Sequence, residues 1–78
     1  MISVKASELK GADIICQWDD TKRAYSKSII VAIKKTAIRN TYKVDDGIEF
    51  SVRDLETAKL SKLTAHPNTI HIVERNEN

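Results

Sequence analysis

Positive charge is concentrated in residues 21–44 of the sequence. This stretch, TKRAYSKSIIVAIKKTAIRNTYKV, carries seven basic side chains and no acidic one, although the whole chain has a net charge of only +2. The flanking residues 1–20 and 45–78 sum to −2 and −3. Clustered Lys and Arg attract phosphate through a term that is independent of base sequence and weakens with salt. The stretch therefore predicts a ridge that binds nucleic acid, made of Lys22, Arg23, Lys27, Lys34, Lys35, Arg39 and Lys43.

Two aromatic residues, Trp18 and Tyr25, flank the start of the basic stretch. Exposed rings beside cations are typical of proteins that stack on unpaired bases, so both residues are candidates for base stacking. Trp18 also alternates with Ile14 and Cys16, which is the pattern of a residue on the core face of a strand. Stacking and core packing both remain open for Trp18, whereas Tyr42 is assigned to the core.

Two aspartate pairs, at 19–20 and 45–46, raise the question of acid–base or metal chemistry. Paired acids can share a proton or hold Mg²⁺. Neighbouring residues of a strand point to opposite faces, however, and aspartate is common in turns. His66 and His71, with Cys16 as the only cysteine, lack the spacing of a zinc site. We therefore expect no catalytic residue, no metal site and no cofactor.

The length of the chain limits what it can do. A domain of 78 residues buries only about 60% of the surface that its unfolded chain exposes, and ligand pockets usually need about 300 to 1,000 Å³. The sequence thus favours a binding module over an enzyme. It has no bilayer-spanning apolar run, no secretory segment and no second cysteine, which predicts a cytoplasmic protein without a membrane partner. Residues 1–75 are expected to form one domain and residues 76–78 a polar tail.

A protein partner is the second hypothesis for the function. Short single-domain chains without motifs often act stoichiometrically on a larger complex, as inhibitors or adaptors, and a small sheet can dock by strand addition or charge complementarity. Under this hypothesis the basic ridge meets an acidic surface, or the acidic remainder of the chain meets a basic one. Unpaired sheet edges allow either a monomer or an edge-to-edge dimer. The acidic remainder includes Asp45, Asp46, Glu49, Asp54 and Glu56.

Apolar and polar residues alternate along much of the chain, which is typical of strands with one buried face. In GIEFSVR, apolar residues occupy every second position after the glycine. Asp46 and Gly47, just before this run, are a strong signal for a two-residue hairpin turn. The strand that enters the turn is expected over residues 36–44. Its core face would consist of Ile38, Tyr42 and Val44.

Further strands are predicted in ISVKA, ADIICQW, KSIIVAIK and NTIHIVE. The segment 27–35 is rich in β-branched residues and is expected to be covered on both faces, with a helix as the alternative because its isoleucines also fit one helical face. Lys34 and Lys35 would then lie near the connection to the next strand. One short helix is predicted over residues 54–63, with Asp54 as its N-cap. The predicted class is mainly β: a small antiparallel barrel or curved sheet of five or six strands with one short helix.

The opening SELKGADIICQW resembles that of small SH3-like barrel modules, some of which occur in bacteriophage accessory proteins. That opening is a turn with Leu, Gly, Asp and Ile in this order, and Ala12 is one extra residue here. The modules continue with strands closed by a DDG-type hairpin and end with a short apolar strand after a proline-containing turn. The resemblance implies an SH3-like barrel, a phage or mobile-element origin and a bacterial host complex as the protein partner, but it assigns no functional residue. The matching positions are Leu9, Gly11, Asp13, Ile14 or Ile15, Asp46, Gly47 and Pro67.

Overall fold

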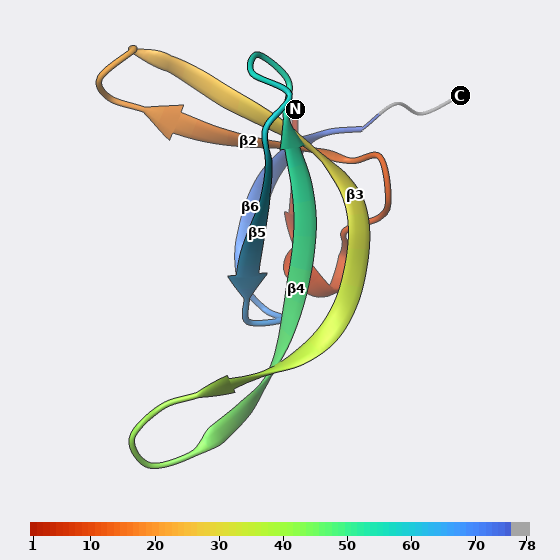
Figure 1. Cartoon of the computed structure of the whole chain (residues 1–78), viewed down its shortest axis with the longest axis vertical. Coiled ribbons are helices and arrows are strands. Elements are labelled where there is room, and N and C mark those ends of the chain that lie inside the picture. Colours follow the sequence, from red (N-terminus) through yellow and green to blue (C-terminus); the bar gives the residue numbers. More distant parts are fainter. Residues whose placement is uncertain (76–78) are drawn as a thin grey trace.

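The chain folds into one curved antiparallel sheet with six strands. The computed structural model describes residues 1–75, so the predicted polar tail 76–78 lies outside the described part. The order across the sheet is β1-β6-β2-β3-β4-β5, and the sheet curls into a half-barrel (Figure 1), which confirms the mainly β class. The elements are β1 (Ile2–Lys5), a 3₁₀ turn (Ala6–Glu8), β2 (Ile14–Asp19), β3 (Ala24–Arg39), β4 (Val44–Asp54), β5 (Leu60–Ala65) and β6 (Ile70–Glu74).

The hydrophobic core lies on the inner face of the half-barrel. At its centre is Phe50 of β4, which is fully buried and belongs to one cluster with Ile30 of β3 and Val73 of β6. The alternation predicted for GIEFSVR is confirmed, because Phe50 and Val52 are buried while Arg53 is exposed. Burial of every second residue fixes which face of each strand is inward, since a shift of one residue would turn the apolar set to solvent.

β3 is a single strand of 16 residues, where the sequence predicted two strands. Its pairing with β4 shifts by one residue between Ile30 and Ala32, so a β-bulge leaves Val31 without a partner residue. Val31 is 51% exposed. The prediction of a strand rather than a helix for residues 27–35 is confirmed, but the expectation that both its faces are covered is wrong, because the apolar run spans a bulge.

The predicted hairpin turn at Asp46 and Gly47 is wrong, since both residues lie inside β4. The chain instead turns at residues 40–43. There the Asn40 side-chain oxygen accepts hydrogen bonds from the backbone N–H groups of Tyr42 and Lys43, at 3.1 and 3.0 Å. An asparagine that binds the backbone two residues ahead is itself a turn former. The hairpin turn at residues 40–43 therefore precedes the Asp-Gly pair at 46–47.

Gly47 does not form a turn; it allows a neighbouring side chain to approach the backbone closely. It pairs with Thr36 of β3 and does not adopt a positive φ. A Cβ atom at this position would lie 2.6 Å from Cγ1 of Ile38. The side chain of Ile38 thus folds over the bare backbone of Gly47, which explains why an Asp-Gly sequence is found within a strand.

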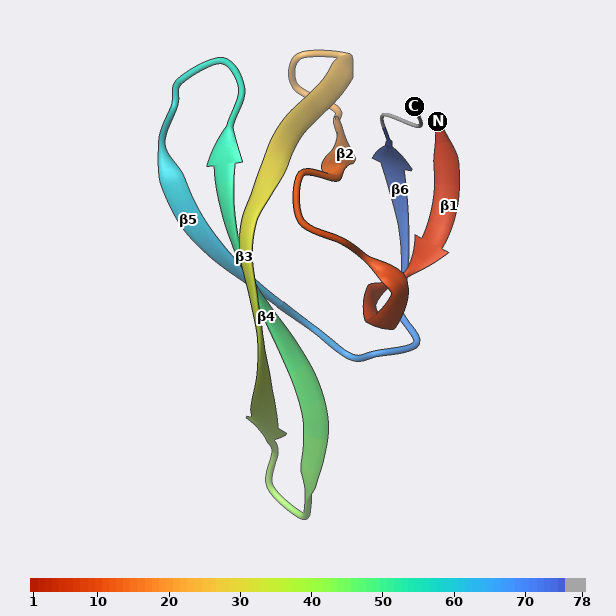
Figure 2. The same ribbon diagram turned by 90° about the vertical axis from the view of Figure 1, so that its right-hand side faces the viewer.

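The ends of β3 and β4 form an arm that leaves the half-barrel. We use "the arm" for residues 36–47, which pair only with each other, because β5 pairs with β4 from Ile48 onward and β2 pairs with β3 only up to Ile29. Figures 1 and 2 show this two-stranded ribbon projecting beyond the remaining strands. An isolated two-stranded ribbon is marginally stable in water. The ordered structure of the arm therefore depends on the Asn40 turn and on the contact of Ile38 with Gly47.

The helix predicted over residues 54–63 is absent, and a tight turn followed by β5 takes its place. Asp54 does cap the backbone, since its Oδ1 accepts hydrogen bonds from the N–H groups of Glu56 and Thr57, at 2.8 and 3.0 Å. Ala58 then adopts a positive φ of 60°, which ends any helical course after one turn. The cap was correctly inferred, but it begins a turn instead of a helix.

A buried ion pair joins Arg75, which follows β6, to Asp13 in the turn before β2. Asp13 is 3% exposed, and its two carboxylate oxygens accept hydrogen bonds from Nε and Nη2 of Arg75, at 2.9 and 2.8 Å. The backbone N–H of Lys10 donates to the same carboxylate, and Arg75 also donates to the carbonyl oxygen of Glu8. The hydrogen bond from Arg75 holds the pKa of Asp13 below its usual value, against the opposing effect of burial.

Candidate binding surfaces

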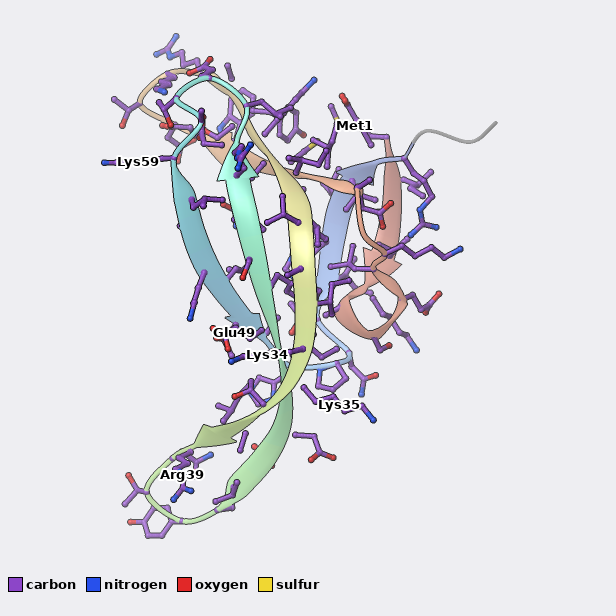
Figure 3. The ribbon with its side chains drawn as sticks, turned by 45° about the vertical axis from the view of Figure 1, so that its right-hand side comes forward. Met1, Lys34, Lys35, Arg39, Glu49 and Lys59 are labelled. Carbon is purple, nitrogen blue, oxygen red and sulfur yellow. The ribbon has the colours of Figure 1, made fainter. Side chains whose placement is uncertain are left out.

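The seven cations of the predicted ridge are spread along the whole of β3. Lys22 and Arg23 lie in the turn before this strand, while Arg39 is its last residue. Sixteen residues of strand follow a path of about 50 Å. Lys34 and Lys35 lie within β3, not near a connection as predicted, and point to opposite sides (Figure 3). The structure therefore does not gather these side chains into one site.

Four of the seven cations pair with acids from other parts of the chain. Lys27 donates to Glu74 of β6 at 2.7 Å, and this hydrogen bond raises the pKa of Lys27. The other three pairs join more exposed lysines to carboxylates at longer distances. Each pair offsets a positive charge that a phosphate would need. These pairs are Lys22 with Glu56 at 3.4 Å, Lys34 with Glu49 at 3.2 Å and Lys43 with Asp45 at 3.6 Å.

Glu49 is the acid that most clearly neutralises the ridge. It lies on the outer face of β4 between Lys34 of β3 and Lys62 of β5, with ion-pair distances of 3.2 and 3.3 Å. The hydrogen bonds from both lysines, that from Lys34 first, hold the pKa of Glu49 below its usual value, although partial burial opposes this. Glu49 therefore stays ionised to a lower pH than a glutamate without such partners.

The remaining cations of the ridge, Arg23, Lys35 and Arg39, have no ion-pair partner within residues 1–75. Lys35 and Arg39 share one face of β3, because residues four apart in a strand point the same way. That face is the inner one, since Lys35 pairs across the sheet with Ile48 and so lies on the side of the core. Two unpaired cations thus lie on the inner face of β3.

Trp18 and Tyr25 lie opposite each other at the end of the β2–β3 hairpin. Trp18 is 55% exposed and Tyr25 39% exposed, so of the two alternatives left open for Trp18, core packing is wrong and its ring is accessible for stacking. The two rings meet edge to face, with 5.3 Å between their centroids. The indole N–H of Trp18 donates to Asp20 at 2.6 Å, which places a negative charge directly beside the aromatic pair.

Tyr42 is the most exposed large apolar residue of the described part, at 96%. The assignment of Tyr42 to the core is therefore wrong, because the Asn40 turn places it at the tip of the arm. Val44, at the start of β4, is 60% exposed. No direct signal in the sequence indicates this site, because it depends on whether Asn40 or the Asp-Gly pair closes the hairpin.

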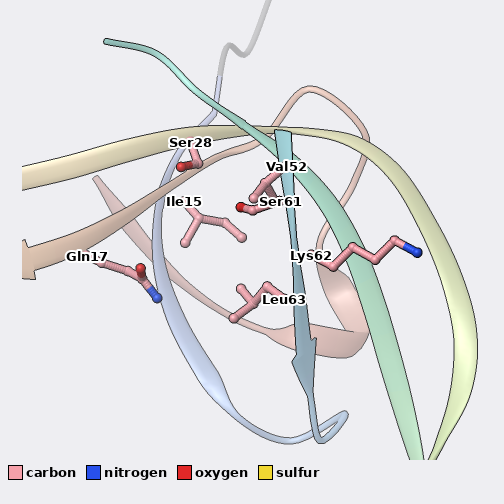
Figure 4. A pocket seen from close by; sticks show the side chains of 7 residues that line it. All are labelled: Ile15, Gln17, Ser28, Val52, Ser61, Lys62 and Leu63. Carbon is pink, nitrogen blue, oxygen red and sulfur yellow. The ribbon is translucent and has the colours of Figure 1, made fainter. Parts of the chain in front are cut away.

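The inner face of the half-barrel contains one small pocket of about 240 Å³. Its volume is below the usual range for ligand sites, about 300 to 1,000 Å³. Its lining includes Ser28, Ser61 and Lys62 but no acid, histidine or cysteine. Figure 4 shows these residues: Ile15, Gln17, Ser28, Val52, Ser61, Lys62 and Leu63.

The single cysteine and the paired aspartates behave as structural residues. Cys16 is buried, as expected, and burial raises the pKa of its thiol. Asp45 and Asp46 are neighbours in β4 and so point to opposite faces. Within the described residues, no three His, Cys, Asp or Glu side chains come together as a metal site would require, and no helix there is long and apolar enough to cross a membrane.

Comparison with known proteins finds no matching protein family, no similar curated protein and no similar solved structure. The function is therefore argued from the arrangement of the residues themselves.

Proposed function

We propose that this protein is a non-enzymatic binding module that docks on a protein partner through the tip of the arm, acting stoichiometrically as an adaptor or inhibitor. The observation that carries the proposal is the exposure of Tyr42 and Val44, 96% and 60%, on a ribbon that no other strand supports. Tyrosine and arginine are enriched among the residues that dominate protein interfaces, and Arg39 pairs with Val44 at the same tip.

The distribution of charge also favours protein over nucleic acid as the partner. Four ridge lysines are neutralised by acids, and the arm itself carries two cations and two acids, Arg39, Lys43, Asp45 and Asp46. Binding to a phosphate backbone depends on many uncompensated cations. A surface of mixed charge with exposed aromatic and aliphatic residues is the composition expected of a protein interface.

Removing the apolar tip is expected to abolish docking. In a cross-linked pull-down from cell extract, the double variant Tyr42→Ser/Val44→Ser should recover at least about tenfold less partner than the wild type, because central aromatic anchors carry most of an interface's affinity. The matched control is Leu55→Ser/Leu60→Ser, which removes two leucines with similar exposure, 50% and 61%, away from the arm. Equal recovery by the tip variant and the wild type would refute docking through the arm.

A second function, binding of single-stranded nucleic acid, is favoured by one observation. The exposed Trp18–Tyr25 pair lies beside the turn that carries Lys22 and Arg23, and aromatic rings next to cations stack on unpaired bases. If this hairpin binds, fluorescence anisotropy of a labelled oligonucleotide should show binding at about 50 mM salt, weaken steeply by about 200 mM and be lost in Trp18→Leu/Tyr25→Leu. An unchanged anisotropy at the lower salt would remove this second function.

A further inference from the structure

The inner face of the arm is continuous with the inner face of the half-barrel. Ile33 pairs with the buried Phe50, and from there every second residue of β3 faces the same side out to the tip of the arm. Cross-strand pairing places residues of β4 beside them on this face. The face contains Ile33, Lys35, Ala37 and Arg39 from β3 and Val44, Asp46 and Ile48 from β4.

A groove of about 420 Å³ lies at the base of this face, between the arm and the segments that carry Ser7 and Pro67. Its lining includes Ile33 and Ile48, and Ile33 is 42% exposed although it adjoins the core. Lys35 also lines the groove. The volume falls within the usual range for ligand sites, and the groove has room for a large aliphatic or aromatic side chain.

The two faces of the arm and of its base, residues 33–35 and 48–50, differ in charge compensation. On the outer face, Lys34 pairs with Glu49 and Lys43 pairs with Asp45. On the inner face, Lys35 and Arg39 have no ion pair with any described residue, and Asp46 is the one acid there, which leaves a formal charge of +1. Exposed cations beside an apolar groove are complementary to a ligand that combines carboxylates with an apolar side chain.

We propose that the inner face of the arm binds an extended acidic peptide segment of the protein partner. One apolar side chain of this segment fills the groove, and two carboxylates pair with Lys35 and Arg39. These residues are four positions apart in β3, about 13 Å along a strand, which is also the separation of two side chains four positions apart in an extended peptide. The inference rests on the proposed docking function and adds the chemical class of the partner segment.

The apolar lining of the groove favours a peptide over nucleic acid on this face. A phosphate backbone has no apolar group to fill the groove between Ile33 and Ile48. The bidentate guanidinium of Arg39 matches a carboxylate. A strand-like ligand is also consistent with the shape of the face, because the ribbon of the arm is itself extended over its length.

Amide chemical shifts of the isotope-labelled protein, titrated with designed peptides of about twelve residues, test this inference. The probe contains Leu-Thr-Asp-Thr-Thr-Thr-Asp, in which the carboxylates are four positions apart and the leucine lies two positions before the first of them, as Ile33 lies two positions before Lys35 in β3. The reversed order of these residues covers the opposite strand direction. One control peptide has lysine in place of aspartate, and a second has serine in place of leucine. We expect the probe to bind at least about tenfold more tightly than either control, with shifts concentrated on residues 33–39 and 44–48.

Two matched variants separate the inner face from general electrostatics. Lys35→Gln/Arg39→Gln removes two unpaired inner cations and should weaken the probe at least about tenfold, whereas Lys34→Gln/Lys43→Gln removes two paired outer cations and should change its affinity by less than about threefold. A dispersed amide spectrum for each variant shows that it remains folded. Equal weakening by both variants would indicate charge alone and overturn the inference.

Three other outcomes would also overturn it: equal binding of the lysine peptide, shifts confined to residues outside 33–48, or displacement of the probe by a single-stranded oligonucleotide on the same residues. The proposed docking function has a separate test, because its readout is capture of the partner through the tip, where Tyr42 lies in the turn between β3 and β4 and outside the groove. If the tip captures a partner but the protein binds the acidic probe no more tightly than the control peptides, only the present inference is refuted. Failure of both tests would refute both.

Discussion

Replacing Asp13 with alanine is expected to lower the free energy of unfolding by about 3 to 5 kcal/mol, the typical cost of breaking a buried ion pair by removing one partner. Asp13 is 3% exposed and receives three hydrogen bonds, two from Arg75 and one from the Lys10 backbone. Because small domains are stable by only about 5 to 15 kcal/mol, thermal unfolding should begin about 12 °C lower or more.

Thermal and urea unfolding of the variants would measure this loss. Asp20→Ala is the control, since Asp20 is an exposed aspartate with a hydrogen bond to Trp18, and it should cost less than about 1 kcal/mol. The double variant Asp13→Ala/Arg75→Ala should lose less than the sum of its single variants, because the two side chains interact. Additive losses would contradict a coupled pair.

The loss caused by Asp13→Ala should also depend on pH. The pKa of Asp13 is lowered in the folded protein, mainly by the hydrogen bond from Arg75. A carboxyl with a lowered folded pKa contributes its full stability above the unfolded pKa, about 4, and loses it as the pH falls through the folded pKa. The difference in stability between wild type and variant should therefore be constant near neutral pH and narrow below about pH 4.

Replacing Phe50 with alanine is expected to have an effect of similar size, again about 3 to 5 kcal/mol, because it removes the largest fully buried side chain and leaves a cavity. Phe50 pairs with Ile33 on one side and Leu63 on the other, so the loss falls on three adjacent strands. Urea unfolding measures the change, and the midpoint should fall without a large change in slope.

Leu60→Ala is the control for Phe50, since Leu60 lies in the adjoining strand β5 but is 61% exposed. It should cost less than about 0.5 kcal/mol, as is usual for surface positions. A loss below about 1 kcal/mol for Phe50→Ala would mean that the inner face of the half-barrel is not a close-packed core, and the assignment of inward residues that follows from it would fail.

The strands of the fold were predictable where one face is buried, because alternation is a local property of the chain. The run around Phe50 was correctly located for this reason. The last strand, residues 70–74, was also located, although Ile70 and Ile72 are exposed and Val73 is the buried apolar residue there. The hairpin was misplaced since two turn signals compete within eight residues, Asn40 and the Asp-Gly pair at 46–47, and the outcome depends on Ile38 covering Gly47. The sequence contains both signals but does not rank them.

The candidate surfaces were less predictable, because neutralisation of a cation requires an acid from elsewhere in the fold. Lys27 meets Glu74, which is 47 residues away in sequence, and no pattern near Lys27 indicates this. The tip of the arm was missed for a related reason, since Tyr42 looks like a core residue when the turn is placed at Gly47. Cations can be counted from a sequence, but their partners depend on the strand order.

The bulge at Val31 determines which of two adjacent lysines belongs to the groove. If Val31 were paired with Ser51, the register found for Ile30 and Val52 would continue unchanged, so Lys34 would lie opposite Ile48 on the inner side. Lys35 would lie opposite Gly47, on the side of Glu49. Regular pairing in place of the bulge would therefore exchange a neutralised charge with a free one while the sequence stays the same. The register of β3 on β4, rather than the chemistry of the side chains, selects the binding surface here.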